Sequence, residues 1–277
     1  MSKTLYLECY SGISGDMTVA ALLDLGADRE VLKESLKSLP VDGFRTEITR
    51  VKKSGLDACD FSVILEQDNH DHDMEYLHGS EKSYTGHHEH SHEVNHEHHH
   101  GHTHSHEHPH EHRGMKEITE IIQKSEMTVR AKKMAMRVFG ILAQAESKAH
   151  GVPVEEVHFH EVGAVDSIVD IAAIAICMDN LDISNVIVPV LYEGTGFIRC
   201  QHGQIPVPVP AVTHIAETHK LKLKITDIQG ELVTPTGAAV VAAFRTSDRL
   251  PEDFTMLKTG IGAGLSLIHI SEPTRLL

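Results

Sequence analysis

The stretch TLYLECYSGISGDMTVAALLDLG, residues 4–26, decides how the fold begins. Residues 4–9 form a short apolar run that predicts a strand, and residues 17–25 carry apolar side chains at helical spacing. Gly26 suits the end of that helix, since glycine adopts the left-handed backbone that closes many helices. Between the two runs lies the turn YSGISGD, residues 10–16. The N-terminus is therefore predicted to be strand, glycine turn and helix.

Outward from this unit, a helix is expected at 28–39 and a β-hairpin at 45–51 and 58–65, around Lys53-Ser54-Gly55. Further helices are expected at 115–124, 128–150, 167–181 and 236–244, and strands at 186–191 and 222–228. Helices and strands alternate without a regular βαβ order, which favours an α+β fold with a mixed sheet. We expect two small domains, 1–66 and 114–264, separated by a disordered His-rich insertion at 67–113.

The insertion has the composition of a metal-binding tract. Of the 24 histidines in the chain, 17 lie in the 43 residues from His70 to His112, interleaved with Glu, Asp, Gly and Ser. The segment has few sizeable apolar side chains, and burying them cannot offset the entropy lost on ordering its backbone. It is therefore expected to be disordered without metal. Neutral imidazole is a common ligand of transition ions. An expression tag and a generic zinc or nickel buffer are the alternatives; the histidines assigned to metal are His96, His98, His100, His102, His104 and His106.

Charge and cysteine content exclude several classes of protein. The formal net charge is −15 with neutral His, which disfavours nonspecific nucleic-acid binding. The four cysteines form no CxxC pair, and the N-terminus has no basic segment followed by a long apolar stretch. We therefore predict a cytoplasmic protein without disulfides, nucleic-acid partner or membrane span, and leave open a homo-oligomer.

The densest group of chemically active residues is His158-Phe-His160-Glu161, followed by Asp166 and Asp170. On a strand, the period of two places both imidazoles on one face, within reach of one metal ion. Asp166 and Asp170 are one helical turn apart at the predicted start of a helix. The alternative is structural, because Ser167-x-x-Asp170 fits a capping box and Asp166 can satisfy first-turn amides.

Two turns are candidate phosphate sites. Ser11, Gly12, Ser14 and Gly15, followed by Asp16, lie between strand and helix, where backbone amides and the helix dipole favour an anion. The pattern matches neither Walker A nor GxGxxG, so a plain tight turn with an Asp cap remains open. The second turn opens the helix at 236–244 and has a plain capping alternative; its residues are Thr234, Thr236 and Gly237.

Cys200 and His202 form a third candidate metal pair. A soft sulfur and an imidazole two residues apart suit nickel, copper or zinc. The alternative is a buried cysteine beside a histidine in a turn.

Four long motifs, in order and around a His-rich insertion, resemble one family. YLECYSGISGDM, HFHEVGAVDSIVDI, IRCQHGQIPVPVPAV and GELVTPTGAA are similar to segments of the nickel-pincer cofactor insertion proteins, the LarC family, over about residues 4–264. The resemblance implies insertion of nickel into pyridinium-3,5-bisthiocarboxylic acid mononucleotide, with consumption of CTP and a divalent cation. The product is the nickel-pincer nucleotide of lactate racemase-type enzymes.

This resemblance gives roles to the candidate residues. The tract would collect nickel, either glycine turn would hold a nucleotide phosphate, and four residues would stage the metal: His158, His160, Cys200 and His202. The residues expected to be catalytic are Asp16, His158, His160, Glu161 and Asp166.

Beyond Gly264 the chain departs from the family's pattern. Residues 265–277, LSLIHISEPTRLL, resemble a translated sequencing adapter, whereas the family continues into a part associated with CTP. We therefore expect a C-terminally truncated fragment that does not complete CTP-dependent insertion. Two other functions remain open: a non-catalytic nickel or zinc storage or delivery protein, and a metal-dependent hydrolase, whose sites often begin with an HxH pair.

Overall fold

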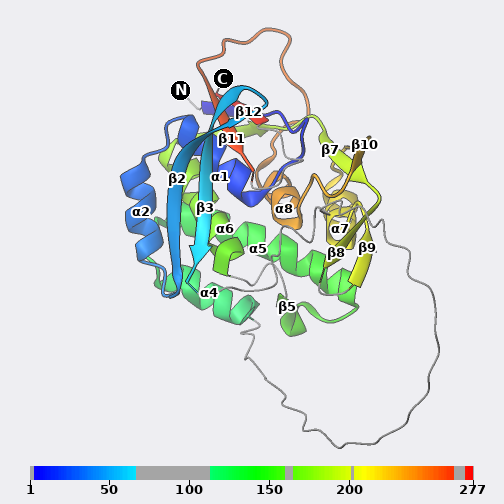
Figure 1. Ribbon diagram of the computed structural model, residues 1–277. Helices are drawn as coiled ribbons and strands as arrows, with labels where there is room; N and C mark the ends of the chain where they lie inside the picture. Colours follow the sequence, from blue (N-terminus) through cyan, green and yellow to red (C-terminus); the bar gives the residue numbers. More distant parts are fainter. Residues whose placement is uncertain (1–2, 67–112, 160–164, 201–202, 265–271, 277) are drawn as a thin grey trace, which may run out of the picture.

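The computed structural model describes residues 3–66, 113–159, 165–200, 203–264 and 272–276 (Figure 1). Its largest element is a six-stranded mixed sheet with the order β2-β3-β11-β12-β1-β6. Pairing is parallel for β3 with β11 and for β1 with β6, and antiparallel for the other neighbours. The strands are β1 (Lys3–Leu7), β2 (Phe44–Lys53), β3 (Leu56–Leu65), β6 (Ile183–Ile187), β11 (Lys258–Ala263) and β12 (Glu272–Leu276).

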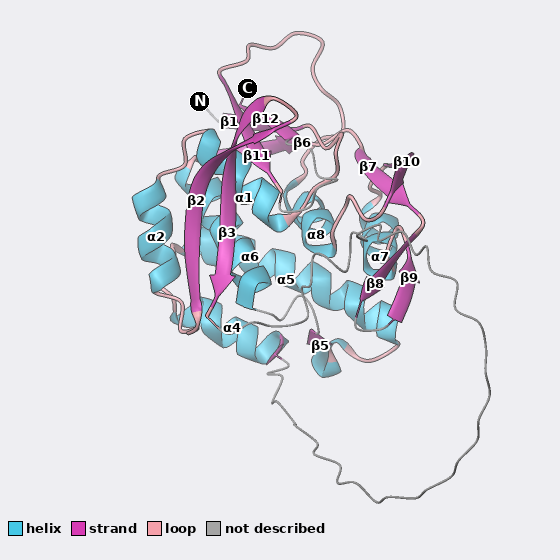
Figure 2. Cartoon of the chain, viewed as in Figure 1, coloured by secondary structure: helices cyan, strands magenta, loops and turns pink. Residues whose placement is uncertain are grey.

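Three smaller sheets have two strands each (Figure 2). β7 (Leu191–Thr195) pairs in parallel with β10 (Leu223–Gln229), and β8 (Phe197–Cys200) forms a hairpin with β9 (Gly203–Pro206). β4 (Arg113–Gly114) pairs with β5 (His158–Phe159), so the residues that follow the insertion lie beside the HxH segment.

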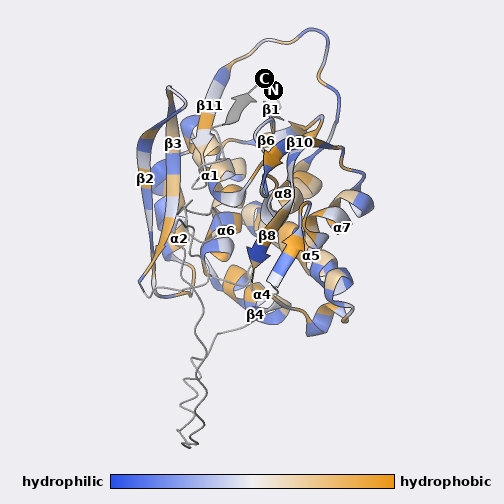
Figure 3. Cartoon of the chain, turned by 45° about the vertical axis from the view of Figure 1, so that its right-hand side comes forward, coloured by the Kyte–Doolittle hydropathy of each residue, from blue (hydrophilic) through white to orange (hydrophobic). Residues whose placement is uncertain are grey.

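The helices pack beneath and beside the large sheet (Figures 1 and 2). They are α1 (Gly15–Asp24), α2 (Arg29–Lys37), α4 (Met115–Lys124), α5 (Val129–His150), α6 (Val165–Asn180), α7 (Pro210–His219) and α8 (Pro235–Phe244), with a short 3-10 turn at Val154–Glu156. α6 is buried from Ile168 to Met178 except at Asp170, because this part of its sequence is otherwise apolar on every side. In contrast, the edge strand β2 mixes hydrophilic and hydrophobic residues (Figure 3), and half-buried and exposed positions alternate over most of its length.

Most of the predicted elements are confirmed. The hairpin, α4 and α5 match their expected bounds within two residues, and Thr128 caps α5 by accepting a hydrogen bond from the amide of Ala131 at 3.0 Å. The strand expected at 186–191 was wrong in extent: β6 ends at Ile187, and β7 begins at Leu191. The apolar run IVPVL spans both elements and the break between them, so its composition did not show where one strand ended.

The α+β class is confirmed, and strands from both sides of the insertion share one sheet. β1, β2 and β3 come from residues 1–66, whereas β6 and β11 come from 114–264. One buried apolar cluster also includes residues from both segments. The expected boundary between two small domains therefore crosses a continuous core. β12, from the segment expected to be an adapter remnant, lies between β11 and β1.

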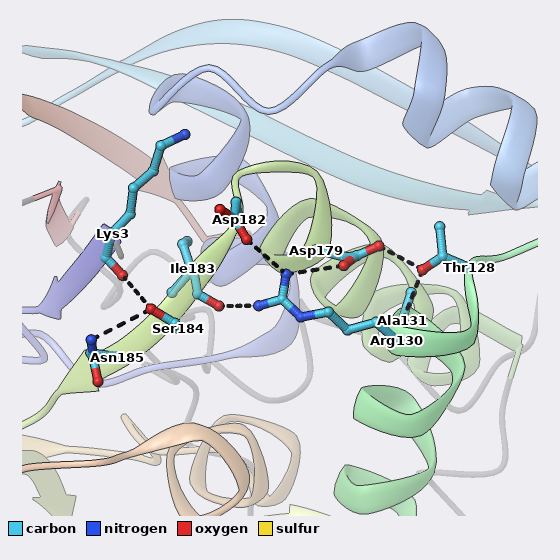
Figure 4. A network of polar contacts seen from close by, with 9 residues as sticks. All are labelled: Lys3, Thr128, Arg130, Ala131, Asp179, Asp182, Ile183, Ser184 and Asn185. Atoms are coloured by element: carbon cyan, nitrogen blue, oxygen red, sulfur yellow. Dashed lines mark hydrogen bonds and ion pairs between the residues drawn. The ribbon is translucent and has the colours of Figure 1, made fainter. Parts of the chain in front are cut away.

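Polar contacts tie the start of α5 to the end of α6 and to β6 (Figure 4). Thr128 donates from its hydroxyl to Asp179 at 2.5 Å, and Arg130 donates to Asp179 at 3.1 Å. Arg130 also donates to Asp182 at 3.4 Å and to the carbonyl oxygen of Ile183. The carboxylate of Asp179 thus binds both Thr128, which caps α5, and Arg130, which joins α5 to β6.

Candidate functional site

The two predicted phosphate turns lie side by side. The amide of Ile13 donates to the carbonyl oxygen of Leu232 at 2.9 Å, and the amide of Thr234 donates to the carbonyl oxygen of Ile13 at 3.0 Å. This short parallel bridge joins the start of α1 to the start of α8. Residues 11–16 and 234–237, more than 200 positions apart in the sequence, therefore lie side by side, and most of them are buried.

Glycine is required on both sides of this contact. Gly12 has φ +88°, and a Cβ atom added there would lie 1.9 Å from the carbonyl oxygen of Leu232. At Gly237 an added Cβ would lie 2.2 Å from the carbonyl oxygen of Ile13. The glycines of both motifs thus permit the close approach of the two backbones.

Several amides of the turns are already engaged within the protein. The amide of Gly12 donates to the carbonyl oxygen of Cys9 at 3.4 Å, and the amide of Asp16 donates to Asp170. The hydroxyl of Thr234 accepts from the amide of Gly237 at 3.1 Å, which is an N-cap of α8, while Thr236 is buried. A phosphate here would have to use the remaining donors, including those of Ser11, Ser14 and Gly15.

Three carboxylates gather beside the first turn. Asp16 lies in the first turn of α1, Asp166 in the first turn of α6, and Asp170 one turn further along α6. Ser14 donates its hydroxyl to Asp16, and a Cβ on Gly15 would lie 2.5 Å from Oδ2 of Asp170. The sequence predicted a relation between Asp166 and Asp170, but only the fold brings Asp16 to them.

Burial raises the pKa of Asp170 well above its ordinary value, and the charges of Asp16 and Asp166 raise it further. Within the described parts of the chain, Oδ1 of Asp170 is buried without a hydrogen-bond partner. An acidic group in such surroundings gains free energy from a proton or from a cation that enters the cluster.

Lys53 approaches the same carboxylates from the sheet. It is the last residue of β2, and its ammonium donates to the carbonyl oxygen of Gly264. Partial burial lowers the pKa of Lys53, against the opposing charges of Asp60 and Asp16. Sequence reasoning assigned Lys53 only to the hairpin turn, because its nearness to Asp16 depends on how the sheet packs on α1 through β3 and β11.

Glu193 on β7 supports the second turn from beneath and was missed by the sequence analysis. Its Oε1 accepts from the amides of Gly194 and Leu232, both at 2.8 Å, and of Val233 at 3.1 Å. The side chain is fully buried, and this burial raises its pKa against the effect of the three amides. The sequence signal was weak: a single Glu before Gly194 in an otherwise uncharged run.

The predicted metal ligands are mostly beyond what the structure describes. His160, Glu161, His202 and the tract histidines, His96, His98, His100, His102, His104 and His106, lie outside the described residues. The backbone of His158 pairs with Gly114 in the β4–β5 ladder. Cys200 is half-buried at the end of the β8–β9 hairpin. Across the described ranges, no group of three or more His, Cys, Asp or Glu is arranged to hold a metal ion.

The other three cysteines, Cys9, Cys59 and Cys177, are buried. Burial raises the pKa of the Cys59 thiol and, more strongly, that of Cys177. The thiols of Cys59 and Cys177 are therefore held in the protonated form.

A separate cavity lies away from these residues. It has a volume of about 660 Å³ and is bounded by Arg130, Met134 and Arg137 of α5, Ile183 of β6 and Phe244 of α8. Phe244 is the last residue of α8, whereas Thr234 caps its first turn, so the cavity and the candidate site lie at opposite ends of that helix. None of the residues predicted from the sequence lines it.

Among the described helices, none has the length and apolar character needed to cross a bilayer.

The chain matches curated proteins over almost its whole length. A pyridinium-3,5-bisthiocarboxylic acid mononucleotide nickel insertion protein from Alkaliphilus metalliredigens is 52% identical over 265 residues, covering 95% of this chain and 57% of that protein. Proteins of the same name from Clostridium acetobutylicum and Acetivibrio thermocellus are 43% and 35% identical, again over 95% of this chain. The chain spans 56–60% of the length of these relatives. No solved structure matches it significantly.

The family model described as nickel insertion protein matches residues 5–277, which is nearly the entire sequence. With the high identity to curated relatives, this match shows that the chain belongs to the nickel insertion protein family.

Proposed function

We propose that this chain is part of an enzyme that inserts nickel into pyridinium-3,5-bisthiocarboxylic acid mononucleotide, as a lyase that forms one metal–carbon and two metal–sulfur bonds, and that the chain alone does not complete the reaction. The observation that carries the proposal is the convergence of Asp16, Asp166 and Asp170 with the two glycine turns. Family membership and the names of the relatives supply the substrates. Nickel is a substrate here, and the His-rich tract is proposed to collect it.

The chemistry requires a proton acceptor. When nickel bonds to a ring carbon, the electron pair of the C–H bond passes to the metal, and the proton must be taken by a base. Asp16 and Asp166 are half-buried carboxylates at the starts of two helices, and we assign this role to them. Asp170 lies beside these two carboxylates, and its raised pKa favours its neutral form.

His158, His160, Glu161, Cys200 and His202 remain proposed partners of the metal. Support comes from residue chemistry, since imidazole and thiolate suit nickel, and from the position of His158 beside the strand that follows the tract. For Ser11, Ser14, Gly15 and Thr236 we propose contact with the nucleotide phosphate through their donors. For Gly12, Thr234 and Gly237, whose amides are engaged within the protein, we propose that they shape the two turns around the phosphate. We also propose that insertion consumes CTP with a divalent cation.

The test joins this chain to the C-terminal part of the Alkaliphilus metalliredigens relative, of which it spans 57%. The joined protein, and the chain alone for comparison, are incubated with the bisthiocarboxylate mononucleotide, Ni²⁺ and CTP with Mg²⁺, and mass spectrometry detects the product, which we expect only from the joined protein. Asp16→Asn and Asp166→Asn should each lower product formation by about 10²-fold or more if they accept the proton. Asp253→Asn is the matched control, because Asp253 is exposed in the segment before β11. Equal activity of all three variants would refute the assignment of the base.

The second candidate function is nickel or zinc storage and delivery without catalysis, which the composition of the tract favours. It predicts stoichiometric metal binding with no metallated mononucleotide under any of these conditions, CTP included. The same mass spectra therefore separate the two functions.

A further inference from the structure

A group of aromatic and cationic side chains, in which Tyr6 is buried and Tyr10 is exposed, lies beside the first glycine turn. All three tyrosines of the described residues, Tyr6, Tyr10 and Tyr192, belong to it. The rings of Tyr10 and Tyr192 meet edge to face, with centroids 5.1 Å apart and an interplanar angle of 87°. Half of the surface of Tyr10 is nevertheless exposed, so this ring is not placed there to fill the core.

Lys224 completes the group. Its ammonium lies 4.6 Å from the centroid of the Tyr192 ring and 3.3 Å from the Tyr192 hydroxyl. In the β7–β10 ladder Lys224 is the direct partner of Tyr192, so the strands fix this neighbour. One ring of the pair thus already receives a cation over its face, where the π electrons attract positive charge.

The backbone ties this group to the candidate site. The amide of Tyr192 donates to the carbonyl oxygen of Cys9 at 3.1 Å, and Tyr10 directly precedes Ser11. The next residue of β7, Glu193, holds the amides of Leu232 and Val233 beside the second turn. Tyrosines and turns therefore belong to one framework of strands.

A surface aromatic pair with a lysine is a common stabilising arrangement, worth little when exposed. Two features distinguish this one: its position next to Ser11, and its fit to a ligand with a flat, permanently cationic ring that carries anionic substituents. Tyrosine faces suit the ring, and the ammonium of Lys224 suits the substituents.

We propose that Tyr10 and Tyr192 form the platform for the pyridinium ring of the mononucleotide, and that Lys224 leaves the Tyr192 face to pair with an anionic group of this substrate. The inference rests on the proposed function and adds the residues that position the ring. These tyrosines and the lysine are positioning residues, because the reacting carbon and the metal meet other groups.

The test uses nicotinic acid mononucleotide, a pyridinium mononucleotide with a single carboxylate, in calorimetric titrations of the whole chain. Tyr10→Leu and Tyr192→Leu should each weaken its binding by about fivefold to thirtyfold, whereas Tyr192→Phe, which keeps the ring, should bind within about twofold of wild type. Lys224→Met should weaken binding and reduce its salt dependence. Phe254→Leu is the matched control, since Phe254 is 41% exposed in the segment before β11.

Ribose 5-phosphate, which lacks the ring, provides a second probe whose affinity the tyrosine variants should leave unchanged. Tyr10→Leu removes a half-exposed side chain, so its thermal unfolding should match wild type and exclude misfolding as the cause. Equal affinity of wild type and both leucine variants for nicotinic acid mononucleotide would overturn the platform, as would failure of wild type to bind it.

The proposed function can fail separately. Tyrosine-dependent mononucleotide binding without any nickel-containing product would overturn the insertion activity and leave the platform standing. Normal product formation by both leucine variants, with unchanged mononucleotide affinity, would overturn the platform and leave the activity standing.

Discussion

Gly237→Ala tests whether the contact between the two glycine turns depends on the missing side chain. An alanine methyl would lie 2.2 Å from the carbonyl oxygen of Ile13, which also accepts from the amide of Thr234 at 3.0 Å. Overpacking costs about 1–3 kcal/mol, and loss of that hydrogen bond about 1 kcal/mol. Alanine in place of a helical glycine returns about 1 kcal/mol. The net expected destabilisation is therefore about 1–3 kcal/mol.

Thermal unfolding of metal-free protein measures this effect. A loss of about 2 kcal/mol should lower Tm by about 4–8 °C for a folded part of this size. Gly140→Ala is the control, because Gly140 lies within α5 and an added Cβ would meet nothing within 4 Å. That variant should gain about 1 kcal/mol from helix propensity. If Gly237→Ala were as stable as Gly140→Ala, the close approach of the turns would not be what requires glycine.

Two further predictions concern Glu193, which binds the amides beside the second turn, and the His-rich tract. Glu193→Ala should cost about 3 kcal/mol or more in urea unfolding, because three buried amides lose their acceptor, while Glu193→Gln keeps an acceptor and should cost much less. Burial raises the pKa of Glu193 in the folded state above its ordinary 4.5. The contribution of Glu193 to stability should therefore decrease as pH rises from about 4.5 to the folded pKa and stay constant above it, and Glu193→Gln should lack this pH dependence. Equal costs for both variants would contradict this account. Replacing residues 68–112 by a short Gly-Ser linker should lower the number of Ni²⁺ ions bound per chain, measured by calorimetry, without changing metal-free Tm, and nickel binding by wild type should weaken below about pH 6 as imidazole takes up protons; a large loss of Tm would show that the tract supports the fold.

Elements with local signals could be predicted from the sequence. The bounds of α5 follow from a capping Thr128 at one end and Gly151, with φ +68°, at the other. The β2–β3 hairpin follows from alternation around Ser54 and Gly55, both of which have positive φ. In each case the residues that fix the boundary are close in the chain to the element.

Elements and site residues that depend on distant partners could not be predicted in the same way. The pairing of β7 with β10 and of β11 with β3 joins segments far apart in the sequence, and α7, which begins at Pro210, was not among the expected helices. Asp170 became notable because Asp16 lies beside it, and Glu193 because two amides from residues 232 and 233 point at it. Local sequence patterns thus indicated many of the residues of the candidate site, whereas tertiary packing determines which of these residues contact one another.

The buried cysteines have a consequence for the proposed handling of nickel. Thiolate binds soft and borderline metals strongly, so an accessible thiolate in the core would compete with the transfer of nickel and retain the ion. Raising the pKa of Cys59 and Cys177 keeps these sulfurs protonated and out of that competition. Half-buried Cys200 thereby differs in kind from the cysteines of the core. Under the proposed function, the same apolar packing that stabilises the fold would keep these two thiols from retaining nickel.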